Sequence, residues 1–175
     1  MSGLPGSGKT RLAKSLAAHG LTRLCPDEEM FRRYGRYGYD FPRGQFLVRE
    51  RPVLDELAVE LGTVLDRGDS AVFDHGLWTS ADRAEWRTIA AAAGAVPVLV
   101  HLPVPHEVLW SRIRVRNQHV HTDPNSIEFS EEDLHRFAGR FHPPGEHEPH
   151  IVYNGRPEAV LSALQPDDDT PESGA

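Results

Sequence analysis

The sequence predicts an α/β fold with three layers, in which helices cover both faces of a parallel sheet. Short apolar segments alternate along the chain with segments of helical period, and this alternation is typical of parallel sheets. A glycine-rich loop stands directly before the first helical segment. The chain has 175 residues, which is enough for one domain with a substantial core.

The order of elements follows from hydrophobic period and from the glycines and prolines between segments. The expected helices are 8–19, one that begins at Asp27, one from Pro52 to Gly68, 82–93, one that begins at Pro105, one from Ser130 to about Phe141, and 158–164. The expected strands are 21–25, 70–74, 96–102 and 150–153. Residues 34–44 are rich in glycine and tyrosine, so we expect a loop that either contacts a substrate or packs on the surface.

The net charge and its distribution indicate which kinds of ligand the chain can bind. The net charge is −7, and four of the acids lie in the last nine residues. The remainder is not basic, which disfavours binding to long nucleic acids but allows a small phosphorylated ligand. We expect a domain over residues 1–164 and a disordered acidic tail at 165–175.

The sequence also gives an expectation for the cellular compartment. No apolar run is long enough to span a bilayer, and the first residues do not form a signal peptide, so we expect a cytoplasmic protein with no membrane partner. Cys25 is the single cysteine, which excludes an internal disulfide and a cysteine zinc site. The sequence gives no indication of oligomeric state.

Residues 3–10 fit the phosphate-loop pattern G-x-x-x-x-G-K-[ST]. Glycine permits backbone angles that let successive N–H groups point at one anion, and Thr10 opens a helix whose dipole favours negative charge. Lys9 is expected to reach the β- and γ-phosphates of ATP, and the Thr10 hydroxyl to bind Mg²⁺. The expected nucleotide contacts are Gly3, Leu4, Pro5, Gly6, Ser7, Gly8, Lys9, Thr10 and Arg11.

The start of the chain is unusual for this motif. A phosphate loop normally follows a buried strand, but only Met1 and Ser2 precede Gly3. The start could be assigned too late, the strand could be missing, or the sheet could close without it. We expect a truncated amino terminus, because the neighbours of a lost central strand would have no ladder partner.

Asp27 and Asp74 each follow an apolar strand, so both are expected at the edge of the sheet where ligands bind. Asp27 could act as the general base that accepts a proton from an attacking hydroxyl, or could simply cap a helix. Asp74 could hold Mg²⁺, or could be a turn residue.

Arg112 and Arg116 are four residues apart and therefore share a helix face. Arginines delivered by a closing segment stabilise the charge of phosphoryl transfer, although a solvated basic face is the alternative. The polar stretch 117–130 that follows contains the His119-x-His121 pair. No third ligand of matching spacing is visible, so these histidines are expected to be solvated.

Taken together, the loop 3–10, Pro26-Asp27, the Val72–Asp74 strand end and Ser80–Arg83 resemble the small P-loop kinases. The most similar group is the set of zeta toxins, chloramphenicol phosphotransferases and polynucleotide kinases labelled AAA-family ATP-binding proteins. The strand at 98–103, the spacing of Arg112 and Arg116 and the later Phe141-His-Pro-Pro also resemble that set. The resemblance covers roughly residues 3–155.

The resemblance implies a P-loop NTPase of the nucleoside-monophosphate-kinase type, with a lid at about 112–141. It further implies transfer of the γ-phosphoryl of ATP·Mg²⁺ to a hydroxyl of a small molecule, with Asp27 as base, Asp74 near the metal, and Arg112 and Arg116 in the lid. A polynucleotide 5′-kinase is the first alternative. Such kinases usually carry an arginine where this chain has Met30. The second alternative is a regulatory module that binds ATP without phosphoryl transfer.

Overall fold

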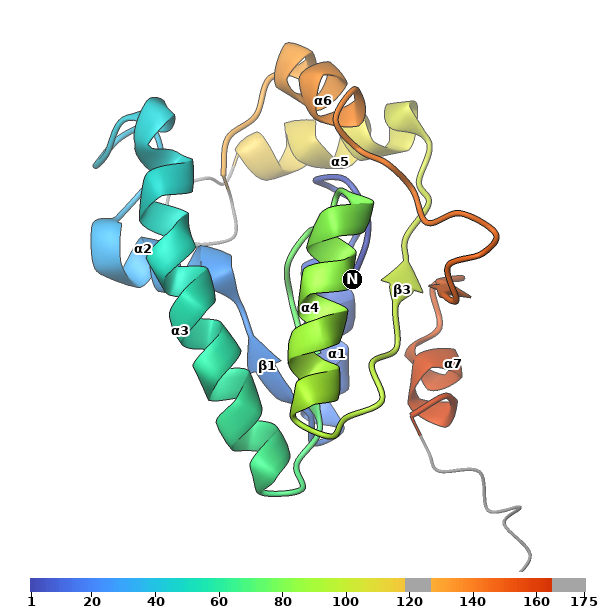
Figure 1. Cartoon of the computed structure of the whole chain (residues 1–175). Coiled ribbons are helices and arrows are strands. Elements are labelled where there is room, and N and C mark those ends of the chain that lie inside the picture. The colour runs from blue at the N-terminus through green and yellow to red at the C-terminus, as the bar shows by residue number, and fades with distance from the viewer. Residues whose placement is uncertain (119–126, 165–175) are drawn as a thin grey trace, which may run out of the picture.

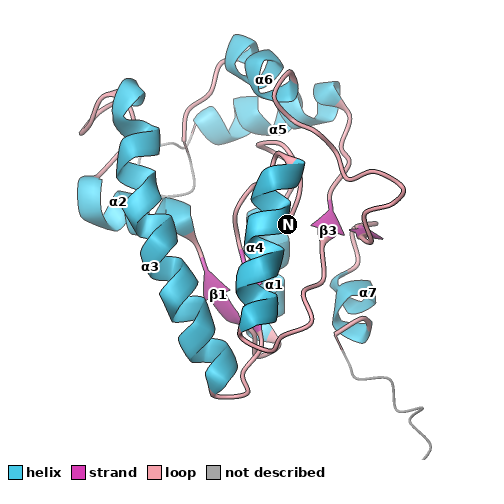
Figure 2. Cartoon of the chain, in the orientation of Figure 1, coloured by secondary structure: helices cyan, strands magenta, loops and turns pink. Residues whose placement is uncertain are grey.

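The computed structural model describes residues 1–118 and 127–164, and its strands form two short parallel pairs (Figure 2). Strand β1 (Thr22–Leu24) pairs with β2 (Ala71–Phe73), and β3 (Val100–His101) pairs with β4 (Ile151–Val152). The parallel pairing agrees with the predicted fold class. The predicted tail at 165–175 and the His119-x-His121 pair lie outside the described residues.

Residues Met1 and Ser2 lie between the two strand pairs. Ser2 forms a parallel bridge with His101, and the amide of Leu77, just beyond β2, donates to the Met1 carbonyl at 3.0 Å. The spatial order is therefore β1, β2, residues 1–2, β3 and β4. The β1–β2 pair and the β3–β4 pair form two half-sheets. A cavity of about 770 Å³ lies between them next to Met1, and Val72 and Val100 line it from either side.

The predicted strand at 96–102 is wrong in length, because only Val100–His101 is assigned to β3. Residues 96–98 line the cavity between the half-sheets, so this stretch lacks a strand beside it on that side. Val96 is accordingly exposed. The other predicted strands are confirmed, each shorter than predicted by one residue at either end.

Helices cover both faces of the strands, and Figure 1 shows α4 (Ser80–Ala92) in front and α1 (Lys9–Ala18) behind. Helix α7 (Pro157–Ser162) packs with α1, and α3 (Phe46–Asp66) packs with α4 and with α2 (Pro26–Tyr34). This arrangement gives the three predicted layers.

Side chains of the strands alternate between two cores, as the period of a strand requires. Val72 of β2 joins the core on the α1 side, whereas its neighbours Ala71 and Phe73 pack against the core on the α3 and α4 side. The buried members on the α1 side are Met1, Leu12, Ala13, Leu16, Val72, Val100, Leu102 and Val160. Those on the other side are Leu24, Met30, Phe41, Val53, Leu57, Leu61, Leu77 and Trp86.

Helices α5 (His106–Asn117) and α6 (Glu131–Ala138) lie over the end of the molecule that carries residues 3–8 (Figure 1). They share a third apolar cluster that is built on Leu109, Ile113 and Leu134. The predicted start of α6 is confirmed, because Ser130 and Asp133 form a capping box.

Helix α3 begins earlier than predicted. A short 3-10 turn (η1, Arg43–Gln45) leads directly into α3 at Phe46, and Pro52 lies inside the helix. The predicted start at Pro52 was wrong for two reasons. Proline favours the first turn of a helix, and the exposed Leu47 interrupts the helical period of apolar residues. No helix within residues 1–118 and 127–164 is both long and apolar enough to cross a membrane.

Candidate active site

The loop that leads into α1 has the backbone of an anion site. Gly6 and Gly8 have φ values of +82° and +100°, which L side chains rarely adopt. A Cβ at Gly6 would also lie 3.0 Å from the carbonyl oxygen of Leu109 on α5. In the described part of the chain, no side chain caps the start of α1, so its first amides remain available to a ligand.

Ser7 provides a second observation that fits a bound phosphate. Its Oγ is buried and has no hydrogen-bond partner among the described residues. A buried hydroxyl without a partner costs free energy, and an anion held by the loop amides would supply the missing acceptor. The residues at 3–10 therefore fit a nucleotide phosphate.

Lys9 lies inside the same loop. Its Nζ donates to the carbonyls of Gly3 and Leu4, at 2.8 and 3.0 Å. Burial lowers the pKa of Lys9 to about 8, and the charges of Asp74 and Asp27 act in the opposite direction. Lys9 therefore shares its surroundings with both acids that the sequence singled out.

Asp74 follows β2 and is buried. The Thr10 hydroxyl donates to its Oδ1 at 3.3 Å, which places two oxygen donors of the kind that Mg²⁺ prefers next to each other. The guanidinium of Arg23 on β1 donates twice to Asp74 Oδ2, at 2.6 and 2.9 Å, and once to Glu28 at 2.8 Å. Sequence analysis missed Arg23, although a charged residue within a short apolar strand indicates a buried partner.

Asp27 lies in the first turn of α2, where the end of β1 places it. Burial, and next the charge of Asp74, raise the pKa of the Asp27 carboxyl to about 6. Lys9 and Arg116 act in the opposite direction. A carboxyl with such a pKa is deprotonated at neutral pH and can still accept a proton, as a general base must.

Arg112 and Arg116 of α5 approach the loop in different ways. Arg112 is exposed, and its Nη1 donates to the Gly6 carbonyl at 3.1 Å. Arg116 is half-buried, donates to the Ile127 carbonyl at 2.8 Å and lies over the ring of Phe129. The structure thus brings the predicted site residues of 3–11, 27, 74, 112 and 116 to one end of the molecule.

Glu50 and His75 were missed by sequence analysis. Glu50 on α3 is buried, and its Oε1 lies 3.9 Å from Nε2 of His75, which follows Asp74. Burial, with the charges of Asp27 and Asp82, raises the pKa of Glu50 to about 8, and burial lowers the pKa of His75 to about 4. Both groups are therefore neutral near pH 7, and their contact is not an ion pair.

Replacing Glu50 by Gln should stabilise the fold at high pH. Because the pKa of Glu50 is raised on folding from 4.5 to about 8, its favourable contribution is complete below 4.5 and disappears as the pH rises through 8. Glu50→Gln is neutral at every pH, so its Tm should equal that of the wild type near pH 5 and exceed it near pH 9.

Thermal unfolding at several pH values measures this difference. The exposed Glu60 on the same helix is a matched control, and Glu60→Gln should leave the pH dependence of Tm unchanged. A Glu50→Gln protein that unfolds at the wild-type Tm near pH 9 would contradict the assignment.

Comparison with known proteins identifies a matching family model and a curated relative of similar sequence. A family model described as AAA domain matches residues 1–144. The chain is 35% identical over 120 residues to a shikimate kinase of Aromatoleum aromaticum, and the match covers 64% of this chain and 60% of that protein. The match therefore spans 60% of the length of this relative, which is less than two thirds.

Solved structures share the fold at low sequence identity. A provisionally assigned kinase from Chloroflexus aurantiacus has a TM-score of 0.68 at 21% identity and covers 93% of both chains. Chaetomium thermophilum Kti12 in complex with ADP-AlF3 has a TM-score of 0.64 at 13% identity, over 94% of this chain and 97% of its own. A sugar kinase from Janibacter sp. HTCC2649 has a TM-score of 0.57 at 20% identity, over 93% and 88%.

Proposed function

The chain belongs to the AAA domain family, whose model matches residues 1–144, and on this premise we propose that it is a P-loop kinase. It transfers the γ-phosphoryl group of ATP to a hydroxyl of a small molecule. Similarity to a shikimate kinase and a fold shared with a sugar kinase support a small acceptor.

In this proposal residues 3–11 hold the triphosphate. The amides of the loop and of the first turn of α1 face the phosphate oxygens, and the buried Ser7 hydroxyl finds its acceptor there. Lys9 exchanges its contacts with the Gly3 and Leu4 carbonyls for the β- and γ-phosphates. The fold shared with a protein that binds ADP-AlF3 supports this placement.

Thr10 and Asp74 would hold the Mg²⁺ that accompanies the nucleotide, because their oxygens lie 3.3 Å apart beside the loop. The ion supplies charge neutralisation on the phosphate oxygens when it is bound. Arg23 fixes the orientation of the Asp74 carboxylate through two hydrogen bonds.

Asp27 acts as the base. Its carboxylate accepts the proton of the acceptor hydroxyl as the hydroxyl oxygen bonds to the γ-phosphorus, and the bond from that phosphorus to the bridging oxygen of ADP breaks. The charge of Asp27 acts on Glu50, so Glu50 lies near the proposed base. The neutral Glu50 carboxyl can donate a hydrogen bond to a further polar group of the acceptor.

The α5–α6 segment, about 112–141, acts as a lid. Arg112 and Arg116 stabilise the charge that spreads over the transferred group. The loop after α2 already touches this segment, since Tyr39 donates to Glu128 at 2.9 Å and Arg43 approaches Asp133 at 3.5 Å. An acceptor enclosed between the loop after α2 and the α5–α6 segment would be shielded from water.

One observation carries the proposal: a carboxylate with a raised pKa, Asp27, shares its surroundings with the lysine of a phosphate loop and with Asp74. The test is a screen of γ-labelled ATP against pooled nucleosides, sugars, antibiotics, shikimate and 5′-hydroxyl oligonucleotides. Label transfer to a small-molecule pool is expected. Transfer to oligonucleotides alone, or to no pool from a protein that binds ATP, would contradict it.

A further inference from the structure

A cluster of three metal-binding side chains lies on the α5–α6 pair. His106 is the first residue of α5, and Glu131 and His135 are four residues apart on α6, which places both on one helix face. One ligand atom from each residue lies within 4.8 Å of the others. None of the three has a role in the proposed phosphoryl transfer.

We propose that His106, Glu131 and His135 bind a divalent transition metal, with zinc as the best match. Two imidazole nitrogens and one carboxylate oxygen are a typical zinc ligand set, with water in the fourth position. The same donors disfavour Mg²⁺ and Ca²⁺, which prefer oxygen ligands alone. The inference does not depend on the proposed kinase activity.

The spacing of the ligands supports a shared ion. Tetrahedral zinc with bond lengths of about 2.0–2.1 Å separates neighbouring ligand atoms by about 3.3 Å. His106 Nε2 and Glu131 Oε1 are 3.4 Å apart, so this pair already has the required separation. The rings of His106 and His135 stack at 4.2 Å between centroids, and a ligand atom of His135 lies within 4.8 Å of those of His106 and Glu131.

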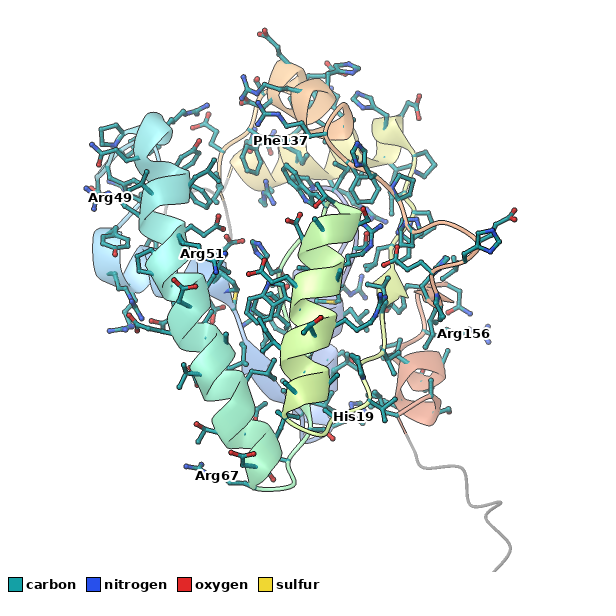
Figure 3. The ribbon with its side chains drawn as sticks, in the orientation of Figure 1. His19, Arg49, Arg51, Arg67, Phe137 and Arg156 are labelled. Atoms are coloured by element: carbon teal, nitrogen blue, oxygen red, sulfur yellow. The ribbon has the colours of Figure 1, made fainter. Side chains whose placement is uncertain are left out.

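The helices that carry the ligands are fixed relative to each other. Leu109, three residues after His106, and Leu134, next to His135, are almost completely buried in the cluster shared by α5 and α6. Phe137 on α6 is labelled in Figure 3. The centroid of its ring lies 5.1 Å from the ring centroids of both Trp78 and Phe129. The metal therefore meets a preformed frame, and its binding ties the start of α5 to α6.

Calorimetric titration of the untagged, nucleotide-free protein with zinc chloride tests the proposal. We expect one ion per chain bound by this cluster, a higher Tm in the presence of zinc, and no displacement by millimolar Mg²⁺. His106→Ala and His135→Ala should each weaken zinc binding at least about tenfold, since each removes one of three protein ligands. Glu131→Gln should also weaken it.

Two controls separate this cluster from other histidines. His147 is exposed on the loop before β4, and His147→Ala should bind zinc as the wild type does. The double replacement of His119 and His121 should also retain the ion. The proposal is overturned if zinc binding survives His106→Ala and His135→Ala at full affinity, if it disappears with the His119 and His121 pair, or if no stoichiometric binding is detected.

Discussion

Replacing Asp27 by Asn is expected to lower the rate of phosphoryl transfer by roughly 10²–10⁴-fold, because it removes the group that accepts the proton of the hydroxyl. The side chain keeps its size, so the triphosphate site at residues 3–11 should be unaffected. Initial rates with the acceptor found by label transfer, together with the dissociation constant for ATP·Mg²⁺, measure the two effects separately.

Glu29 provides the matched control for Asp27. It lies in the same first turn of α2, but it pairs with Arg32 and Arg33 of the same helix. Glu29→Gln should therefore transfer phosphate at close to the wild-type rate. Equal rates for Asp27→Asn and the wild type would exclude Asp27 as the base.

The second large effect is expected in stability. Arg83 on α4 is 2% exposed, and its guanidinium donates to both carboxylate oxygens of Glu148 at 2.8 Å and to the His142 carbonyl at 2.7 Å. In Arg83→Met the Glu148 carboxylate keeps only its longer bond to Arg87. The His142 carbonyl loses its hydrogen bond from Arg83. We expect the free energy of unfolding to fall by about 1–3 kcal/mol, the cost of leaving a buried acceptor unsatisfied, because Glu148 keeps its bond to Arg87.

Arg87 is the control for Arg83, because it binds the same Glu148 from a half-exposed position, at 3.2 Å. Arg87→Met should lower the free energy of unfolding by about 1 kcal/mol or less. Urea titration of both variants gives the comparison. Similar midpoints for the two variants would show that the buried contacts of Arg83 do not stabilise the segment at 142–148.

Local signals explain why the sequence predicted the core of the site. The loop at 3–10 is one continuous motif, and its conformation depends mainly on its own glycines. Asp27 and Asp74 could be placed at one edge because each ends an apolar strand, and parallel strands end together. Neither step required knowledge of long-range packing.

Partners that are distant in the sequence could not be predicted in the same way. Arg23 binds Asp74 from a strand 51 residues earlier, and no pattern links the two positions. In the sequence Glu50 lies between Arg49 and Arg51, and a run of charged residues is typical of a solvated surface. The helical period from Val53, Leu57 and Leu61, extended backwards, places Glu50 on the buried face, but Pro52 suggested that the helix began later.

The parallel pairing of the strands was predicted correctly, but the strands are shorter than predicted. Strand length depends on a neighbour with free backbone groups, and Ser2 supplies β3 with a single bridge. The contact of His106 with α6 likewise depends on how α5 and α6 pack against each other. Sequence spacing carries no information of that kind.

The binding of ATP·Mg²⁺ at residues 3–11 is the claim on which the rest depends. Isothermal titration calorimetry of the folded full chain, with Lys9→Met beside it, tests this claim most directly. We expect one nucleotide per chain, bound at least about tenfold more weakly by Lys9→Met, because charge-assisted hydrogen bonds to phosphate are lost. An absence of binding heat from the folded wild type, or equal affinity in the two proteins, would contradict the account.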